Sequence, residues 1–306
     1  MARRFRQDHA AAGPETLPVF LRQNPSGTPN LFMTNRRTCI GVFDSGFGGL
    51  TVLKALLRLI PDADYLYFGD SARLPYGSKS AETVARYAVG AAHYLEQQGA
   101  QILVIACNTA TALALDKIAQ AASVPVVGVI EPGAERAAGA SENKKVVVIG
   151  TEATVSSHAY LKALETRGVD AKEKACPLLV PLVEEGWIDH PVTEEVARIY
   201  LKEAFADDFK QADVLLLGCT HYPLIQPVLR KVAPKHVKIV DSADATADAV
   251  GRLLRRTPLS AAPELERRKL PRLKCFATDS ADKFRRLGAQ FLGHPIDNVQ
   301  HVDLAE

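Results

Sequence analysis

Two cysteines with matching surroundings offer the clearest chemistry in this chain. Cys107 lies in the string ACNTA and Cys219 in the string GCTHYP, and each follows a short apolar run, at 102–105 and 214–217. Each run predicts a buried strand and each cysteine precedes a predicted helix, which places both thiols at the carboxyl ends of parallel strands, where open α/β sheets bind ligands. A helix N-terminus lowers the pKa of a thiol, so we expect both cysteines to exchange protons. Two such thiols facing one cleft suit a reaction that moves a proton from one face of a carbon to the other.

The placement of these cysteines depends on a regular alternation of predicted strands and helices. The predicted strands are rich in Val, Ile and Leu without polar alternation, as in parallel sheets buried on both faces. They cover 39–43, 65–68, 102–106, 126–130, 146–150, 214–218 and 237–241. The predicted helices lie near 49–60, 80–98, 109–122, 155–167, 192–206, 224–233 and 243–256. Such alternation is typical of doubly wound α/β folds.

The number of strands and the repeated cysteine turn predict two lobes. We expect an α/β protein with two similar doubly wound parallel-sheet lobes and the active site in the cleft between them. The polar, breaker-containing string EPGAERAAGASENKK marks a boundary near 130–145. The first expected lobe combines residues 39–133 and 241–306, and the second covers residues 134–240. The charged stretch 256–272 is expected to be a surface connection.

Composition places the chain among ordinary globular proteins and disfavours two classes of partner. The chain has 306 residues, of which 47% are hydrophobic and 24% charged, and its net charge of +2 disfavours a dedicated nucleic-acid binder. Its apolar runs are far shorter than a membrane span, so no membrane association is expected. Residues 1–38 are basic and rich in proline, which predicts a disordered extension. The five cysteines have no regular spacing and predict no disulfide framework, which favours the reducing cytoplasm.

Two loops follow the first two predicted strands. In FDSGFGG the glycines allow a sharp turn and close approach to a ligand, and Asp44 is a candidate general-base partner or ammonium anchor, with helix capping as the structural alternative. The loop is not a dinucleotide fingerprint, because Thr51 stands where Gly or Ala is required. In GDSARLPYG, Asp70 and Tyr76 are candidate polar contacts, although turn formation alone would account for them.

Other polar residues leave their roles open. Glu184 and Glu185 in CPLLVPLVEEGW either reach the cleft or begin a helix, and the Thr and Ser residues of VVVIGTEATVSSHAY either bind an anion or cap a helix. Cys219 and His221 would supply two metal ligands, but no other Cys/His pair has structural-zinc spacing, so no metal site is expected. The remaining cysteines are expected to be buried apolar residues: Cys39, Cys176 and Cys275.

Taken together, seven strings resemble the glutamate racemase family in order and spacing. They are FDSGFGGLTVL, YFGDSARLPYGSKS, ILVIACNTATA, GVIEPG, VVVIGTEATVSS, CPLLVPLVEEG and LLLGCTHYPLI. The similarity runs from about residue 39 to the string at 276–293, and only 1–38 and 256–272 fall outside it. The resemblance implies a cofactor-independent, two-base racemase that interconverts L- and D-glutamate and supplies D-glutamate for peptidoglycan. It implies glutamate as the small-molecule partner and a homodimer as the assembly, with no cofactor, metal, nucleic acid or membrane.

The resemblance also implies roles for individual residues. Cys107 and Cys219 match the two acid/base thiols on opposite faces of the α-carbon, and Asp44 and His221 match the groups that assist them. The residues that match the family's substrate contacts are Asp44, Ser45, Tyr76, Gly77, Asn108, Thr109, Thr220 and His221. A glutamate of the LVEEG string contributes in the family, and either Glu184 or Glu185 matches it.

Two alternatives remain beside this interpretation. The first is an aspartate racemase of the same superfamily, which the strings DSGFGG and CTHYP disfavour because aspartate relatives commonly differ around the second cysteine. The second is a non-catalytic binding or regulatory protein on the same fold, which the paired thiols disfavour because a binder needs no proton carriers. A substrate panel separates the first from glutamate racemisation, and alanine at Cys107 or Cys219 separates the second.

Overall fold

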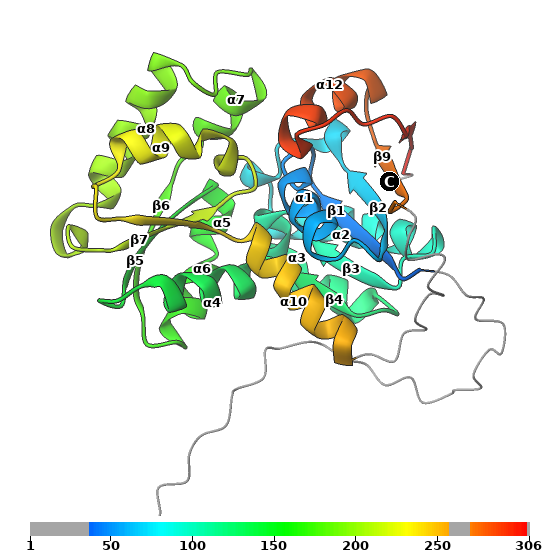
Figure 1. Ribbon diagram of the computed structural model, residues 1–306, viewed down its shortest axis with the longest axis horizontal. Coiled ribbons are helices and arrows are strands. Elements are labelled where there is room, and N and C mark those ends of the chain that lie inside the picture. Colours follow the sequence, from blue (N-terminus) through cyan, green and yellow to red (C-terminus); the bar gives the residue numbers. More distant parts are fainter. Residues whose placement is uncertain (1–36, 257–269, 305–306) are drawn as a thin grey trace, which may run out of the picture.

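The computed structural model describes residues 37–256 and 270–304 and shows two parallel β-sheets flanked by helices (Figure 1). The first sheet has the strand order β10-β9-β2-β1-β3-β4 and the second β6-β5-β7-β8, with every pairing parallel. The strands are β1 (Cys39–Asp44), β2 (Asp64–Gly69), β3 (Ile102–Ile105), β4 (Val126–Gly128), β5 (Lys145–Gly150), β6 (Asp170–Ala175), β7 (Val214–Gly218), β8 (Lys238–Asp241), β9 (Leu273–Ala277) and β10 (Val299–His301). The expected α/β fold with two parallel-sheet lobes is confirmed.

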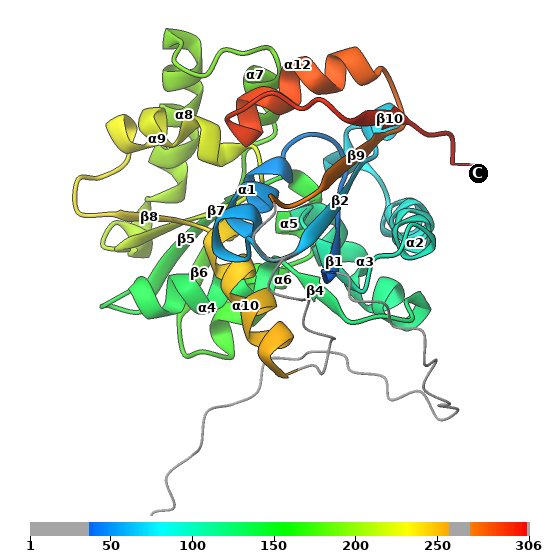
Figure 2. The same cartoon turned by 45° about the vertical axis from the view of Figure 1, so that its right-hand side comes forward.

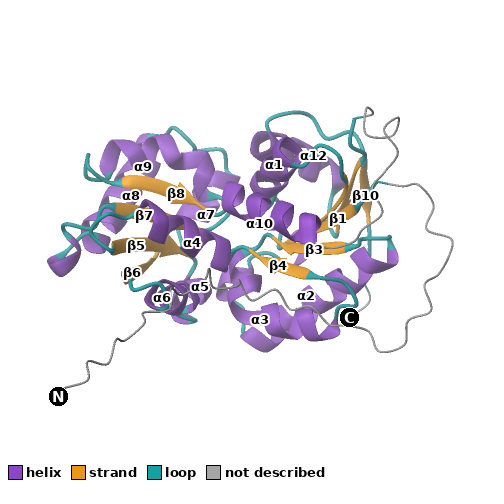
Figure 3. Ribbon diagram, turned by 60° about the horizontal axis from the view of Figure 1, so that its bottom comes forward, coloured by secondary structure: helices purple, strands orange, loops and turns teal. Residues whose placement is uncertain are grey.

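Helices lie on both faces of each sheet, and α10 lies between the two sheets (Figure 3). The α-helices are α1 (Leu50–Leu59), α2 (Ala81–Gln97), α3 (Asn108–Ala121), α4 (Ile130–Ala140), α5 (Glu152–Ser156), α6 (Ala159–Glu165), α7 (Leu179–Glu184), α8 (Pro191–Ala204), α9 (Gln226–Val232), α10 (Ala243–Arg256) and α12 (Ala281–Leu292). Among the described helices, none is long and apolar enough to cross a bilayer.

The unbroken apolar runs of the sequence form strands that are buried on both faces. In β3, Ile102 and Val104 join one core cluster, whereas Leu103 and Ile105 join the cluster under α2 and α3. Successive side chains of a strand point to opposite faces, so a strand covered on both sides has no position for a polar residue. Strand β3 ends at Ile105 and α3 begins at Asn108, so Cys107 stands in the short turn between them.

The first sheet is completed by a segment from the end of the chain. After α10 the chain returns, and β9 pairs with β2 while β10 adds the edge strand (Figure 2). The strands of the first sheet thus come from 39–128 and 273–301, and those of the second from 145–241. The exact lobe limits, 133/134 and 240/241, stay a prediction. The expected extension at 1–38 and the surface connection at 256–272 lie mostly outside the described residues.

Some elements differ from the sequence-based expectations for local reasons. Strand β6 has the polar sequence DAKEKA, which an edge strand tolerates because one side of it is unpaired. Much of the stretch at 130–145 forms α4, which begins with a proline in its first turn and continues with small, buried alanines. The helix expected at 155–167 is divided into α5 and α6 at His158, whose φ is 54°. The helix expected at 224–233 begins with a 3-10 turn at Tyr222–Ile225.

Candidate active site

Both cysteines line a single cavity of about 360 Å³ between the two lobes. Its lining joins the ends of strands from both sheets, since Cys107 follows β3 and Cys219 follows β7. The lining residues that matter here are Ser45, Tyr76, Gly77, Cys107, Asn108, Thr109, Thr151, Glu184, Glu185, Cys219, Thr220 and His221. The structure therefore brings together the residues that the sequence predicted from separate strings, with Asp44 buried just outside the lining.

Cys107 is the capping residue of α3, and its sulfur has two polar neighbours. The Ala110 backbone N–H donates to Sγ at 3.3 Å, and the thiol donates to Ser45 Oγ at 3.5 Å. Burial, together with the nearby charge of Asp44, raises the pKa of this thiol to about 12. The expected lowering of the Cys107 pKa by the helix N-terminus is therefore wrong, because the loss of hydration outweighs the helix.

Asp44 ends β1 and is fully buried. Its Oδ2 accepts a hydrogen bond from the Gly46 backbone N–H at 2.9 Å, whereas its buried Oδ1 has no hydrogen-bond partner within the described part of the chain. Burial raises the pKa of this carboxyl, and the positive charge of His221 opposes the rise. A Cβ at position 49 would lie 2.5 Å from the Asp44 Cβ, so Gly49 is needed for the close turn. The assistance of Cys107 by Asp44 stays a prediction.

The second cysteine turn contains His221, which contacts Glu184 at the end of α7. His221 Nδ1 lies 3.9 Å from Cys219 Sγ, and His221 Nε2 lies 3.0 Å from Glu184 Oε1. Burial disfavours the imidazolium, but the hydrogen bonds to Cys219 and Glu184 and their charges raise the pKa of His221 to about 10. Glu184 is therefore the glutamate that contacts His221, while Glu185 also lines the cavity.

Three threonine hydroxyls join the two lobes beside the cavity. Thr109 Oγ1 at the start of α3 lies 2.9 Å from Thr151 Oγ1 and 3.3 Å from Thr154 Oγ1, which both belong to the start of α5. Thr151 also caps α5 by accepting from the Thr154 backbone N–H. Beside them, Asn108 Oδ1 accepts from the Tyr160 hydroxyl at 2.7 Å, and the buried Asn108 Nδ2 has no hydrogen-bond partner among the described residues. This corner thus offers hydroxyl and amide donors, with the carboxylate of Glu152 also lining the cavity.

Tyr76 lines the cavity, and its hydroxyl is bound by Asp70, which is not among the lining residues. The Tyr76 hydroxyl donates to Asp70 Oδ2 at 2.6 Å, and Asp70 Oδ1 accepts from Thr278 Oγ1 at 2.8 Å and from Arg73 Nη1 at 3.1 Å. Burial and the charge of Asp70 raise the pKa of Tyr76. Asp70 is therefore an anchor for the loop that carries Tyr76 and Gly77. Sequence reasoning missed Thr278, which follows the unpredicted strand β9.

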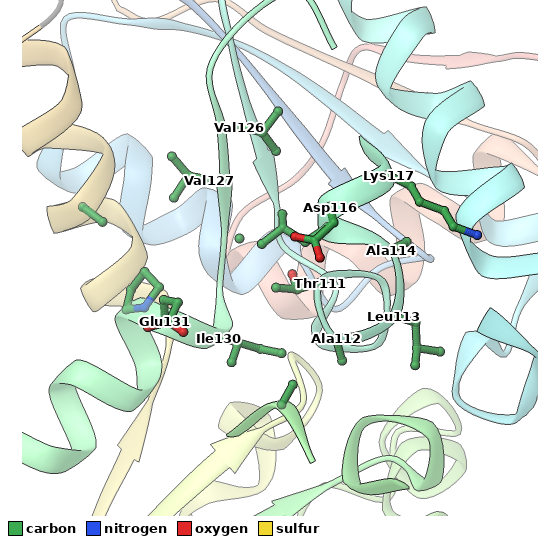
Figure 4. Close-up of a pocket in the computed structure, with 15 residues that line it drawn as sticks. Thr111, Ala112, Leu113, Ala114, Asp116, Lys117, Val126, Val127, Ile130 and Glu131 are labelled. Atoms are coloured by element: carbon green, nitrogen blue, oxygen red, sulfur yellow. The ribbon is translucent and has the colours of Figure 1, made fainter. Parts of the chain in front are cut away.

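A second cavity, of about 440 Å³, lies among α3, β4 and α4 (Figure 4). Its lining is largely apolar, and the labelled charged residues are Asp116, Lys117 and Glu131. None of its lining residues is a cysteine or a histidine, so it lacks the proton carriers of the first cavity. Within the described residues no cluster of three or more His, Cys, Asp or Glu side chains could hold a metal ion.

Comparisons with known proteins agree on one family. The Asp/Glu/Hydantoin racemase family matches residues 40–250. A glutamate racemase from Koribacter versatilis is 61% identical over 290 residues, which are 89% of this chain and 99% of that protein. The solved glutamate racemase isoform RacE1 from Bacillus anthracis is 35% identical with a TM-score of 0.81, over 87% of this chain and 98% of that one. The Francisella tularensis glutamate racemase, solved with D-glutamate, is 36% identical with a TM-score of 0.79, over 88% and 98%.

The resemblance noted in the sequence is thereby confirmed over nearly the whole described chain. The matched span contains both cysteine turns, and the matched structures share the two-lobed fold. This chain belongs to the Asp/Glu/Hydantoin racemase family.

Proposed function

We propose that this protein interconverts L- and D-glutamate and thereby supplies D-glutamate for peptidoglycan, with Cys107 and Cys219 exchanging the α-proton from opposite faces. The observation that carries the proposal is that both sulfurs line one cavity of about 360 Å³ between the lobes. The similarity of this chain to proteins named glutamate racemase supports glutamate as the substrate. A cytoplasmic location and a homodimer stay predictions.

The proton chemistry needs one cysteine in each protonation state. One thiolate removes the α-proton, and the opposite thiol donates a proton to the other face of the same carbon. After the reaction the first sulfur is a thiol and the second a thiolate, so the enzyme is then ready for the other enantiomer. Atoms and charge balance without any oxidant or reductant. Each thiol therefore acts as a general acid in one direction and a general base in the other.

The carbanion must be stabilised where it forms, because the α-proton of an amino acid is weakly acidic. Among the described residues the cavity lining contains no lysine or arginine, so, apart from the His221 imidazolium, the substrate carboxylates are bound by neutral donors. The unpartnered Asn108 Nδ2, the hydroxyls of Thr109 and Thr151 and the backbone N–H groups at the start of α3 are suited to this. Such donors are preorganised and stabilise developing charge without moving.

Asp44 and His221 would serve the two halves of the reaction differently. The unpartnered Asp44 Oδ1 is an acceptor for the substrate ammonium or for a proton near Cys107. His221 lies between Cys219 and Glu184 and can pass a proton to or from the Cys219 sulfur. The remaining matched contacts, Ser45, Tyr76, Gly77 and Thr220, line the space between them.

The test is incubation of the purified protein with each glutamate enantiomer in deuterated water without pyridoxal phosphate. Circular dichroism reports racemisation, and proton NMR reports deuterium entering at the α-carbon. The wild type is expected to do both, while Cys107→Ala and Cys219→Ala each lose racemisation and remain folded. Cys275→Ala is the matched control, because that cysteine is buried in β9 and is not among the residues lining the cavity. Turnover of aspartate but not glutamate, or normal racemisation by both single variants, would reject the proposal.

A further inference from the structure

Phe291 of α12 touches the histidine of the second cysteine turn. The centroids of the Phe291 and His221 rings lie 5.2 Å apart, and the ring planes meet at 81°. Both side chains are buried, with 2% of Phe291 and 4% of His221 exposed. Near-perpendicular packing is a preferred geometry for aromatic rings, and it restricts how each ring can turn.

The contact crosses from one lobe to the other. Cys219, His221 and Glu184 belong to the second sheet and its helices, whereas α12 follows β9 of the first sheet. The backbone of the first lobe also approaches closely, because a Cβ at Gly48 would lie 2.6 Å from His221 Nδ1. His221 is therefore held by polar partners from its own lobe and by carbon atoms from the other lobe.

The polar contacts alone leave the Nδ1 side of the imidazole, which faces Cys219, with little restraint. His221 Nε2 is fixed at 3.0 Å from Glu184 Oε1, but Nδ1 lies 3.9 Å from the Cys219 sulfur. A small rotation about the Glu184 contact would change the distance to sulfur, and proton transfer is sensitive to such displacements. The Phe291 ring packs against the imidazole, and Phe291 also lines a neighbouring cavity beside α1, so a smaller side chain at this position would leave space next to His221.

We propose that Phe291 is a positioning residue that holds His221 in reach of Cys219 and so makes proton transfer on this face depend on a contact between the two lobes. The proposal rests on the proposed function for its kinetic part and on the ring contact alone for its structural part. It assigns a role in the reaction to the C-terminal segment, in which Phe291 lies 70 residues after His221.

The kinetic test compares primary isotope effects for α-deuterated L- and D-glutamate. Each enantiomer presents its α-hydrogen to one particular cysteine, so a defect at Cys219 raises the isotope effect for one enantiomer only. Phe291→Leu is expected to lower kcat on the order of tenfold and to raise one isotope effect. Phe291→Tyr keeps the ring and is expected to retain kcat within about twofold. Phe291→Met replaces the leucine variant if the latter does not fold.

Phe284→Leu is the matched control, because Phe284 is also buried on α12 but packs its ring against Phe47 and Tyr67. Its isotope effects are expected to match those of the wild type. A readout that needs no activity is the ring nitrogen NMR signal of His221, assigned by its loss in His221→Asn. This signal is expected to shift or broaden in Phe291→Leu and to remain in place in Phe284→Leu.

The outcomes separate the two proposals. An inactive wild type rejects the proposed function, and the His221 signal still tests the contact. Wild-type isotope effects and an unchanged His221 signal in Phe291→Leu would overturn the positioning role. The same one-sided isotope effect in Phe284→Leu would also overturn it, because the cause would then be general loosening of α12.

Discussion

The two cysteine turns occupy equivalent places in their sheets but have different surroundings. Cys107 caps a helix of 14 residues and has a hydroxyl group, from Ser45, as its side-chain neighbour. Cys219 precedes a 3-10 turn of four residues and has an imidazole as its neighbour, which in turn contacts the Glu184 carboxylate. The two lobes thus place their sulfurs at equivalent positions, but the polar side chain next to each sulfur differs.

This difference indicates that burial and neighbouring groups, rather than the helix N-terminus alone, set the proton chemistry at each turn. At Cys107 burial raises the thiol pKa to about 12 in spite of the helix N-terminus. At the other turn the pKa of His221 is raised to about 10, which places a cation beside Cys219 at neutral pH. We expect the resting enzyme to be asymmetric, with a neutral thiol on the Cys107 side and the imidazolium of His221 on the other.

The largest expected effect comes from removing the partner of Cys219. His221→Asn should lower kcat by roughly a hundredfold to a thousandfold, because a positioned acid/base group contributes about 10² to 10⁴ to rate. Ser45→Ala removes the corresponding neighbour of Cys107 and should lower kcat only severalfold, since a hydroxyl at 3.5 Å contributes a weak hydrogen bond. Steady-state racemisation measured by circular dichroism gives both values. Equal losses in the two variants would contradict the asymmetry.

The second prediction tests the Cys107 side through Asp44. Asp44→Asn keeps one oxygen, which can accept from the Gly46 N–H, and replaces the other carboxylate oxygen with an amide group that donates. We expect kcat/KM to fall by about a hundredfold, as for loss of a charged hydrogen bond worth about 2–3 kcal/mol. Asp213→Asn is the control, because Asp213 accepts from Ser141 and neighbouring backbone N–H groups away from the cavity. Unchanged kinetics in Asp44→Asn would remove this carboxyl from the mechanism.

The sequence predicted the parts of the site that are carried by strong local patterns. The runs before Cys107 and Cys219 are short and wholly apolar, which is typical of strands buried on both faces, and open α/β sheets bind ligands at the carboxyl ends of such strands. The sign of the Cys107 pKa shift was not predictable, because it depends on burial by residues distant in sequence. Thr278 and Phe291 were missed because β9, with the sequence LKCFA, is interrupted by a lysine and α12 gives no motif of its own.

The third prediction uses the pH dependence of the rate to test the role of His221 beside Cys219. Glu184 stabilises the imidazolium of His221 by a hydrogen bond and by its charge, so Glu184→Gln should lower the His221 pKa from about 10. The imidazolium would then be lost at lower pH, and the alkaline limb of the rate profile should move down by about one pH unit. Glu185→Gln is the matched control, since Glu185 lines the same cavity beside Glu184. A profile that moves only in Glu185→Gln would exchange the roles of the two glutamates.

The smallest effect is expected where the C-terminal segment supports the Cys107 side. Thr278 Oγ1 donates to Asp70 Oδ1 and accepts from the Ala72 backbone N–H at 3.0 Å, which fixes the loop that carries Tyr76. Thr278→Val keeps the shape and removes both hydrogen bonds, so it should destabilise the protein by about 1–2 kcal/mol. KM for glutamate should rise severalfold with little change in kcat, because the loop would bind substrate less well without altering either sulfur. Thr278→Ser should restore KM, and a Thr278→Val variant with a lower kcat and an unchanged KM would show that this loop acts on the proton transfer instead.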